Sequence, residues 1–155
     1  MGARMGVIEA GNKVSRARKR SWRGDLRDAA QNALAAGGYG HDTLAPLVLT
    51  VVIVRSRPST HMGTGRNAGV LKDWAADLLP VQRPDATKVL RAAEDALQGI
   101  LYLDDSQIVE QHVFKAYGDQ CGLTAASEGL FVEVETAASY AGSMIRFDVV
   151  PAETA

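Results

Sequence analysis

Apolar residues recur at two different spacings along the chain, and the spacing predicts which segments are helices and which are strands. Over residues 21–36 they recur every three to four positions, as in an amphipathic helix, and a glycine pair follows at its end. The same spacing predicts a second helix over 86–97, which Asp85 is placed to cap. We expect Trp22 and Leu26 to face the core.

Several other segments are β-branched or alternate between apolar and polar residues, which is typical of strands. We expect strands over 46–57, 107–117, 130–135 and 144–150, with a further short β-like run over 5–10. Residues 58–84 lack either pattern, and a loop of that length in a compact domain is usually functional.

This element order predicts a single α/β (α+β) domain with a mixed β-sheet packed against two main helices. The domain is expected to span residues 1–155, with a basic N-terminal segment over 1–20 and a C-terminal extension over 138–155. The 155 residues are 46% hydrophobic and 23% charged, which is ordinary for a globular protein. The single cysteine, Cys121, excludes an internal disulfide and a cysteine-based zinc site. Without a long apolar run or an apolar start, a cytoplasmic location is expected, with no membrane partner.

Basic residues gather near the start of the chain although the net charge is only −1. The first 23 residues contain one acid, Glu9, and these basic residues: Arg4, Lys13, Arg16, Arg18, Lys19, Arg20 and Arg23. Salt confines electrostatic fields to about 10 Å, so a local cluster can contact phosphates on a neutral protein. A solvated helix start or a frayed basic arm explains the cluster equally well.

Two adjacent carboxylates, Asp104 and Asp105, stand just before the strand predicted over 107–117. Neighbouring anions repel each other, and a turn needs at most one aspartate, so the second requires another reason. A divalent cation would supply that reason. Taken alone, a turn at this pair and a helix cap at Asp85 explain the residues as well.

The segment over 61–69, HMGTGRNAG, offers backbone N–H groups, Arg66 and Asn67 for contacts with phosphate. His61 is a further candidate for DNA contact, although a lone histidine is more often structural. The glycines do not form a nucleotide-binding loop, because no Gly-Lys-Ser/Thr follows, so no nucleotide cofactor is expected.

Three segments occur in an order that resembles the RusA family of Holliday-junction resolvases, especially its phage-type members. Residues 57–69 come first, then Arg-Pro-Asp-Ala-Thr-Lys-Val-Leu-Arg opens a helix that ends in Asp-Ala-Leu, and then Asp-Asp-Ser-Gln-Ile-Val follows. The similarity spans about residues 22–135. It implies a homodimeric, magnesium-dependent endonuclease, with Mn²⁺ as an alternative metal, that nicks four-way DNA junctions in recombination, repair or phage DNA processing.

The resemblance also assigns roles position by position. Asp85 matches the family's first metal-binding aspartate, Asp104 and Asp105 match its acidic pair, and Arg91 stands at its catalytic lysine or arginine. Lys88 replaces an asparagine found in some members and is a second candidate for phosphate contact.

The chain departs from the family pattern at two places. Thr87 stands where the family's second aspartate is expected, and Glu94, two helical turns later, returns to the same helix face. We hypothesise that Glu94 restores the missing charge; a solvated surface glutamate is the alternative. The usual extra N-terminal strand and its basic turn are also missing, which suggests either a start assigned too late or a shortened member.

Three function classes follow from the sequence. The first is a structure-selective endodeoxyribonuclease that resolves branched DNA. The second is a junction- or duplex-DNA-binding protein with weak or no nuclease activity, which Thr87 and the near-neutral charge permit. The third is an α/β interaction protein in which the acidic pair is only a turn.

Overall fold

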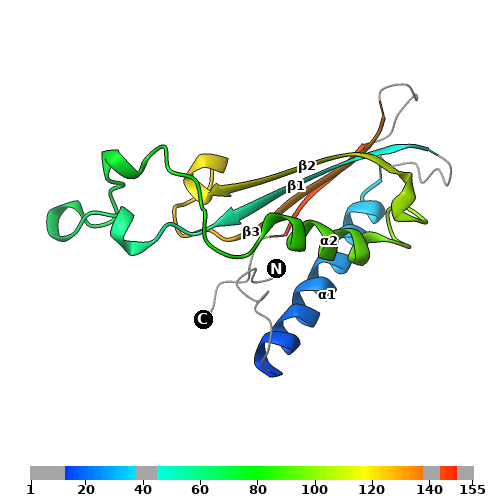
Figure 1. Ribbon diagram of the computed structural model, residues 1–155, viewed down its shortest axis with the longest axis horizontal. Helices are drawn as coiled ribbons and strands as arrows, with labels where there is room; N and C mark the ends of the chain where they lie inside the picture. The colour runs from blue at the N-terminus through cyan, green and yellow to red at the C-terminus, as the bar shows by residue number, and fades with distance from the viewer. Residues whose placement is uncertain (1–12, 38–44, 138–143, 150–155) are drawn as a thin grey trace.

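The computed structural model describes residues 13–37, 45–137 and 144–149 (Figure 1). Its helices and strands follow in the order α1 (Lys13–Ala35), β1 (Leu47–Arg55), α2 (Ala86–Leu97), β2 (Ile108–Tyr117), β3 (Gly129–Thr136) and β4 (Met144–Val149). Each predicted helix and strand within these residues is confirmed. The helix α1 starts earlier than its apolar pattern indicates, so residues 13–20 continue a helix and are not a frayed arm.

The four strands form one mixed sheet in the order β2-β1-β3-β4. Strands β1 and β2 are parallel, whereas the β1–β3 and β3–β4 pairs are antiparallel. Parallel neighbours need a crossover, and here α2 lies within it, so α2 runs in the opposite direction to both strands. The predicted mixed sheet with two main helices is therefore confirmed.

Both helices pack on one face of the sheet, where every second residue of β1 is buried. Trp22 and Leu26 of α1 are fully buried in this core, which confirms their predicted inward orientation. Arg27 Nη1 donates to the Ala96 carbonyl oxygen at 3.0 Å, so α1 also supports the C-terminal turn of α2. This packing fixes α2 against the sheet.

The expected C-terminal extension contains a strand of the sheet. Strand β4 pairs with β3, and its Ile145 and Phe147 join the core. The short run expected over 5–10 lies outside the described residues. No helix in the described ranges is long and apolar enough to cross a bilayer.

Residues 58–84, which we call the lobe, project beyond the C-terminal ends of β1 and β2 (Figure 1). Three short 3-10 helices give the lobe its only helical turns: Ser59–His61, Gly65–Asn67 and Asp73–Ala75. The lobe then leads into α2 at Asp85, so the loop predicted from its lack of periodicity is confirmed.

Candidate functional site

The first aspartate of the acidic pair has a structural role. Asp104 accepts a hydrogen bond from the Ser106 backbone N–H at 2.9 Å, and Gln107 Oε1 accepts from the backbone N–H groups of Leu103 and Asp104 at 2.9 and 3.3 Å. This reciprocal arrangement is a capping box. The bonds from Ser106 lower the pKa of Asp104. The cap accounts for Asp104 but leaves Asp105 to be explained.

Asp105 lies near Glu94, a half-buried residue on α2. Glu94 accepts a hydrogen bond from Gln111 Nε2 on β2. Its pKa is raised, first by burial of the carboxylate and then by the negative charge of Asp105. We call Asp104, Asp105 and Glu94 the acidic end. The negative charges of Glu94 and Asp105 repel each other, and a bound cation would relieve this repulsion.

Asp85 stands in a basic environment instead. It occupies the N-cap position of α2, but its side chain does not cap the helix; it pairs with Lys88 Nζ at 3.1 Å. The hydrogen bond from Lys88 lowers the pKa of Asp85, with smaller contributions from Arg83 and Lys115. We call Arg83, Asp85, Lys88 and Lys115 the basic end. Both Asp85 and Lys88 are therefore engaged with each other.

The acidic and basic ends lie at opposite ends of α2. Asp85 precedes the helix and Glu94 is nine residues further, which at about 1.5 Å per residue separates them by about 13 Å. In the part of the chain that the structure describes, no three His, Cys, Asp or Glu residues form a group that could hold a metal ion. Within the described residues of one chain, Asp85 therefore lies apart from Asp104 and Asp105, and their role as metal ligands stays a prediction.

Helix periodicity places Thr87, Arg91 and Glu94 on one face of α2. Because Glu94 contacts Gln111, this face borders β2. The exposed Arg91 lies between the two ends, one turn from Thr87. Glu94 is about 10 Å along the helix from Thr87 and adds a carboxylate to the acidic end. Its compensation for the carboxylate missing at Thr87 stays a prediction.

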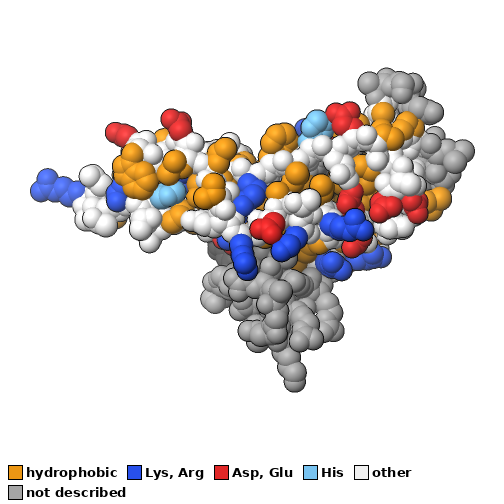
Figure 2. Space-filling view, in the orientation of Figure 1, with side chains coloured by type: hydrophobic (Ala, Val, Ile, Leu, Met, Phe, Trp, Pro, Cys, Tyr) orange, Lys and Arg blue, Asp and Glu red, His pale blue; other side chains and the backbone are white. Residues whose placement is uncertain are grey.

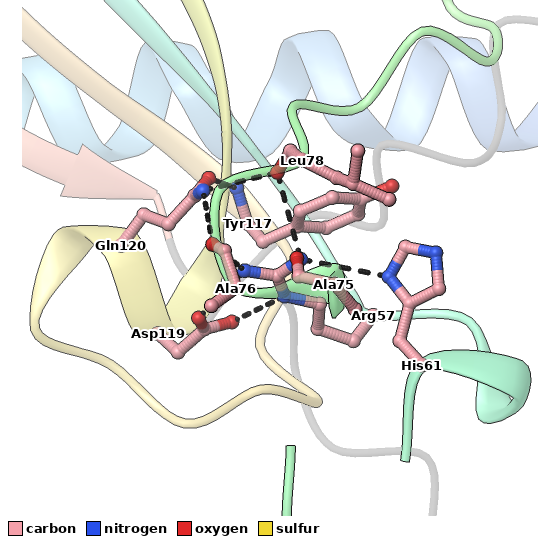
Figure 3. A network of polar contacts seen from close by, with 8 residues as sticks. All are labelled: Arg57, His61, Ala75, Ala76, Leu78, Tyr117, Asp119 and Gln120. Carbon is pink, nitrogen blue, oxygen red and sulfur yellow. Dashed lines mark hydrogen bonds and ion pairs between the residues drawn. The ribbon is translucent and has the colours of Figure 1, made fainter. Parts of the chain in front are cut away.

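The lobe is held to the sheet by Arg57, whose side chain is fully buried (Figure 3). Its guanidinium donates to both carboxylate oxygens of Asp119 at 2.8 and 2.9 Å, and to the carbonyl oxygens of Ala75 and Ala76 at 2.6 and 3.0 Å. It also stacks over the Tyr117 ring, 4.2 Å from the ring centre. We call these contacts the lobe anchor. The anchor lowers the pKa of Asp119, chiefly through the hydrogen bond from Arg57.

His61 belongs to this anchor. It is 8% exposed, its Nδ1 lies 3.5 Å from Arg57 Nη1, and its ring meets Trp74 and Tyr117 edge to face. This burial argues against the expectation that His61 touches DNA, because its ring packs against Trp74 of the lobe and Tyr117 of β2. The tip of the lobe presents Arg66 and Asn67 to solvent, where either can reach a phosphate.

Basic side chains gather over the α2 side of the molecule and at the tip of the lobe (Figure 2). The predicted DNA-contacting residues of the N-terminal cluster, Arg16, Arg18, Lys19 and Arg20, belong to α1, but their side chains lie outside what the structure describes. Their role stays a prediction.

Comparison with known families decides what these features belong to. A family model described as Endodeoxyribonuclease RusA matches residues 4–125, which is most of the chain. The chain belongs to the RusA family. The RusA family implies an endonuclease that acts on Holliday junctions, so the resemblance seen in the sequence is confirmed. The chain is also 27% identical over 104 residues to Uncharacterized protein YqaN of Bacillus subtilis (strain 168), covering 61% of this chain and 72% of that protein. No solved structure matches the chain significantly.

The donors of this RusA-family acidic end fit a magnesium ion. Mg²⁺ prefers hard oxygen ligands and is usually bound through one or two carboxylates together with water and substrate phosphates. Asp105 and Glu94 provide such carboxylates.

Sequence reasoning missed the residues that support the site. Gln107 completes the capping box, and the spacing Asp-x-x-Gln was a signal that could have revealed it. Gln111 and Lys115 lie on the same face of β2, four residues apart. Gln111 reaches the acidic end and Lys115 the basic end. The Arg57–Asp119 pair joins residues 62 positions apart, and the sequence contains no local signal for it.

Proposed function

We propose that this chain is a magnesium-dependent endonuclease that acts as a homodimer and cuts branched DNA such as four-way junctions. The observation that supports it is the acidic end. Glu94, a half-buried glutamate whose pKa is raised by burial and by Asp105, lies near Asp105, which matches the acidic pair of the RusA-family pattern.

Hydrolysis of a phosphodiester requires a nucleophilic water and neutralisation of the charge that develops on the phosphoryl oxygens. When bound, Mg²⁺ supplies charge neutralisation and lowers the pKa of its water, and Asp105 and Glu94 would hold it. Arg91 is exposed on the same helix face and is placed to bind the scissile phosphate. A guanidinium stays protonated, so Arg91 stabilises charge and does not donate a proton.

Other residues would bind the DNA arms. Arg66, Asn67 and the backbone N–H groups at the lobe tip are suited to phosphate contacts, and the anchor keeps the tip in a fixed place relative to the sheet. The basic residues of the N-terminal cluster are further candidates for contacts with the DNA arms. Lys88 can reach a phosphate only after leaving Asp85, so we assign it a secondary role.

A cleavage assay on a four-way junction tests the proposal. We expect nicking that requires Mg²⁺ or Mn²⁺, and at least a 100-fold loss with Asp105→Asn, since removing one group that stabilises transition-state charge typically costs about 10²–10³ in rate. Asp77→Asn is the control, because it removes an exposed carboxylate of the lobe, outside the acidic end. Full activity of Asp105→Asn would exclude the acidic end as the site.

Two observations favour a second candidate, a junction- or duplex-DNA-binding protein with weak or no nuclease activity. Thr87 replaces a carboxylate of the family motif, and Asp85 is paired with Lys88 rather than with other acids. This candidate predicts junction binding that weakens steeply with added salt, because phosphate contacts release counterions, but no metal-dependent cleavage.

A further inference from the structure

The lobe carries most of the large apolar side chains that the described residues expose to solvent. Five of them fall within residues 70–81: Val70, Trp74, Leu78, Leu79 and Val81. Figure 2 shows apolar side chains gathered on the lobe, between its basic tip and the body of the molecule. Single exposed apolar residues are ordinary, whereas a group of them marks a binding surface. Within this group Trp74 provides the only aromatic ring, and it is 61% exposed.

Trp74 is held in a fixed position although its side chain is exposed. The backbone N–H of Lys72 donates to the His61 carbonyl oxygen at 2.9 Å, and the Ala75 carbonyl oxygen accepts from Arg57 at 2.6 Å. The main chain is therefore bound on both sides of Trp74. The indole also meets the His61 ring edge to face, with the ring centres 5.4 Å apart. A ring that is already fixed loses little entropy when it binds a ligand.

The charges around Trp74 restrict what the ring can bind. Lys72 Nζ lies 5.9 Å from the centre of the ring, within cation–π distance. The same ammonium donates to the Thr60 carbonyl oxygen at 3.0 Å, and it has further N–H groups for a phosphate. Two exposed carboxylates, Asp73 and Asp77, are close to Trp74 in the chain. They oppose the rows of phosphates on an intact duplex, but they do not oppose one neutral base with its phosphate at Lys72.

From this combination we infer that Trp74 is a stacking platform for an unpaired base of branched DNA, with Lys72 and Arg66 contacting the phosphates beside that base. The inference takes DNA as the ligand, and in that respect it rests on the proposed function. Stacking on an aromatic ring is open to every base, because every base has a flat π face. The site therefore recognises an unpaired base and not a sequence.

A branch point supplies such a base. The stack of base pairs is interrupted there, so a base turns toward the protein at a lower cost than inside a continuous duplex. The lobe projects beyond the strand ends, so it can approach an open branch point ahead of the sheet (Figure 1). Stacking of one base strengthens binding by about 5- to 150-fold. The preferred substrate is therefore a branched DNA with an unpaired base at its centre.

Binding to single strands tests the inference without metal or cleavage. The probes are oligothymidylate and an abasic strand of the same length, which presents the same phosphates without bases. We expect wild-type protein to bind oligothymidylate at least about fivefold more tightly, and Trp74→Ala to bind both strands equally. Trp74→Phe keeps a ring and should retain part of the preference. Val81→Ala is the control and should retain all of it, because Val81 is 90% exposed in the same lobe but has no ring.

Fluorescence distinguishes stacking on the ring from a general apolar contact. The chain contains two tryptophans, of which Trp22 is fully buried and Trp74 is exposed. Saturating oligothymidylate should quench the emission of wild-type protein and leave the emission of Trp74→Phe, which comes from Trp22 alone, unchanged. The inference is overturned by any of four results: no binding or equal binding of the two strands, a preference that survives Trp74→Ala, an equal loss in Val81→Ala, or no quenching. The exposed apolar group would then be a surface for a protein partner.

The stacking site and the proposed nuclease activity can fail independently of each other. If wild-type protein cuts branched DNA but does not prefer oligothymidylate, the stacking site is excluded and the nuclease assignment remains. If wild-type protein does not cut but shows a preference that depends on Trp74, the proposed nuclease activity is excluded and the stacking site remains.

Discussion

Replacing Asp119 with alanine tests how the lobe is held. The change removes the only carboxylate that the structure pairs with the buried Arg57, while the carbonyl oxygens of Ala75 and Ala76 remain. Removing one partner of a buried ion pair costs about 3–5 kcal/mol. The Asp119 side chain is 28% exposed, so solvent screens the pair and the low end, about 3 kcal/mol, applies.

This cost falls on the lobe and not on the sheet, because the anchor joins the lobe to the strand ends outside the main core. A loss of about 3 kcal/mol makes local opening about 100-fold more frequent. Hydrogen exchange should therefore accelerate about 100-fold at the amides of Gly63 and Lys72, which bond to Val70 and His61 within the lobe at 2.8 and 2.9 Å. Exchange at the buried amides of β1 should stay unchanged.

Asp77→Ala is the matched control, since Asp77 is an exposed aspartate of the same lobe. It should leave exchange at Gly63 and Lys72 as in the wild type. Equal exchange rates in the Asp119→Ala and Asp77→Ala variants would refute the claim that the ion pair holds the lobe. Acceleration throughout β1 would refute the claim that the effect is local.

Three further predictions follow from the same contacts. Because Arg57 lowers the pKa of Asp119, the ion pair stabilises the lobe above about pH 4 and is lost as pH falls through the lowered pKa of Asp119. In a pH series, amides of the lobe should therefore exchange with a larger opening fraction below that pKa. Burial and the charge of Asp105 raise the pKa of Glu94, so the ionised Glu94 carboxylate destabilises the fold as pH rises. Glu94→Gln should therefore keep or slightly raise Tm at neutral pH while it reduces cleavage. A lower Tm would contradict this account. Asp104→Ala removes a cap and should lower stability in denaturant unfolding more than Asp105→Ala does; equal losses would argue against separate roles.

The fold could be predicted largely because its elements are periodic. The stripe on α2 and the alternation along β3 are local patterns, and the structure follows them to within a residue or two. Residues 13–20 contain no comparable stripe, so the early start of α1 could not be predicted from apolar spacing. The anchor joins residues far apart in the chain, and periodicity has no information about such contacts.

The separation of Asp85 from Asp105 was foreseeable from topology. A helix that connects two parallel strands must run back along them, so the residue before the helix and the residue before the second strand lie at opposite ends of the crossover. The family motif suggests instead that its acidic residues lie close together in one chain. Connectivity, not spacing, sets where these carboxylates lie.

The lobe anchor binds main-chain atoms of the lobe. Arg57 contacts the carbonyl oxygens of Ala75, Ala76 and Leu78, which every amino acid provides. The non-glycine residues at the tip can therefore be exchanged without weakening the attachment, whereas Gly65 and Gly69 have positive φ of 59° and 80° and favour glycine. A natural or engineered change of target could begin at residues 64–70, with the strand-end arginine kept in place.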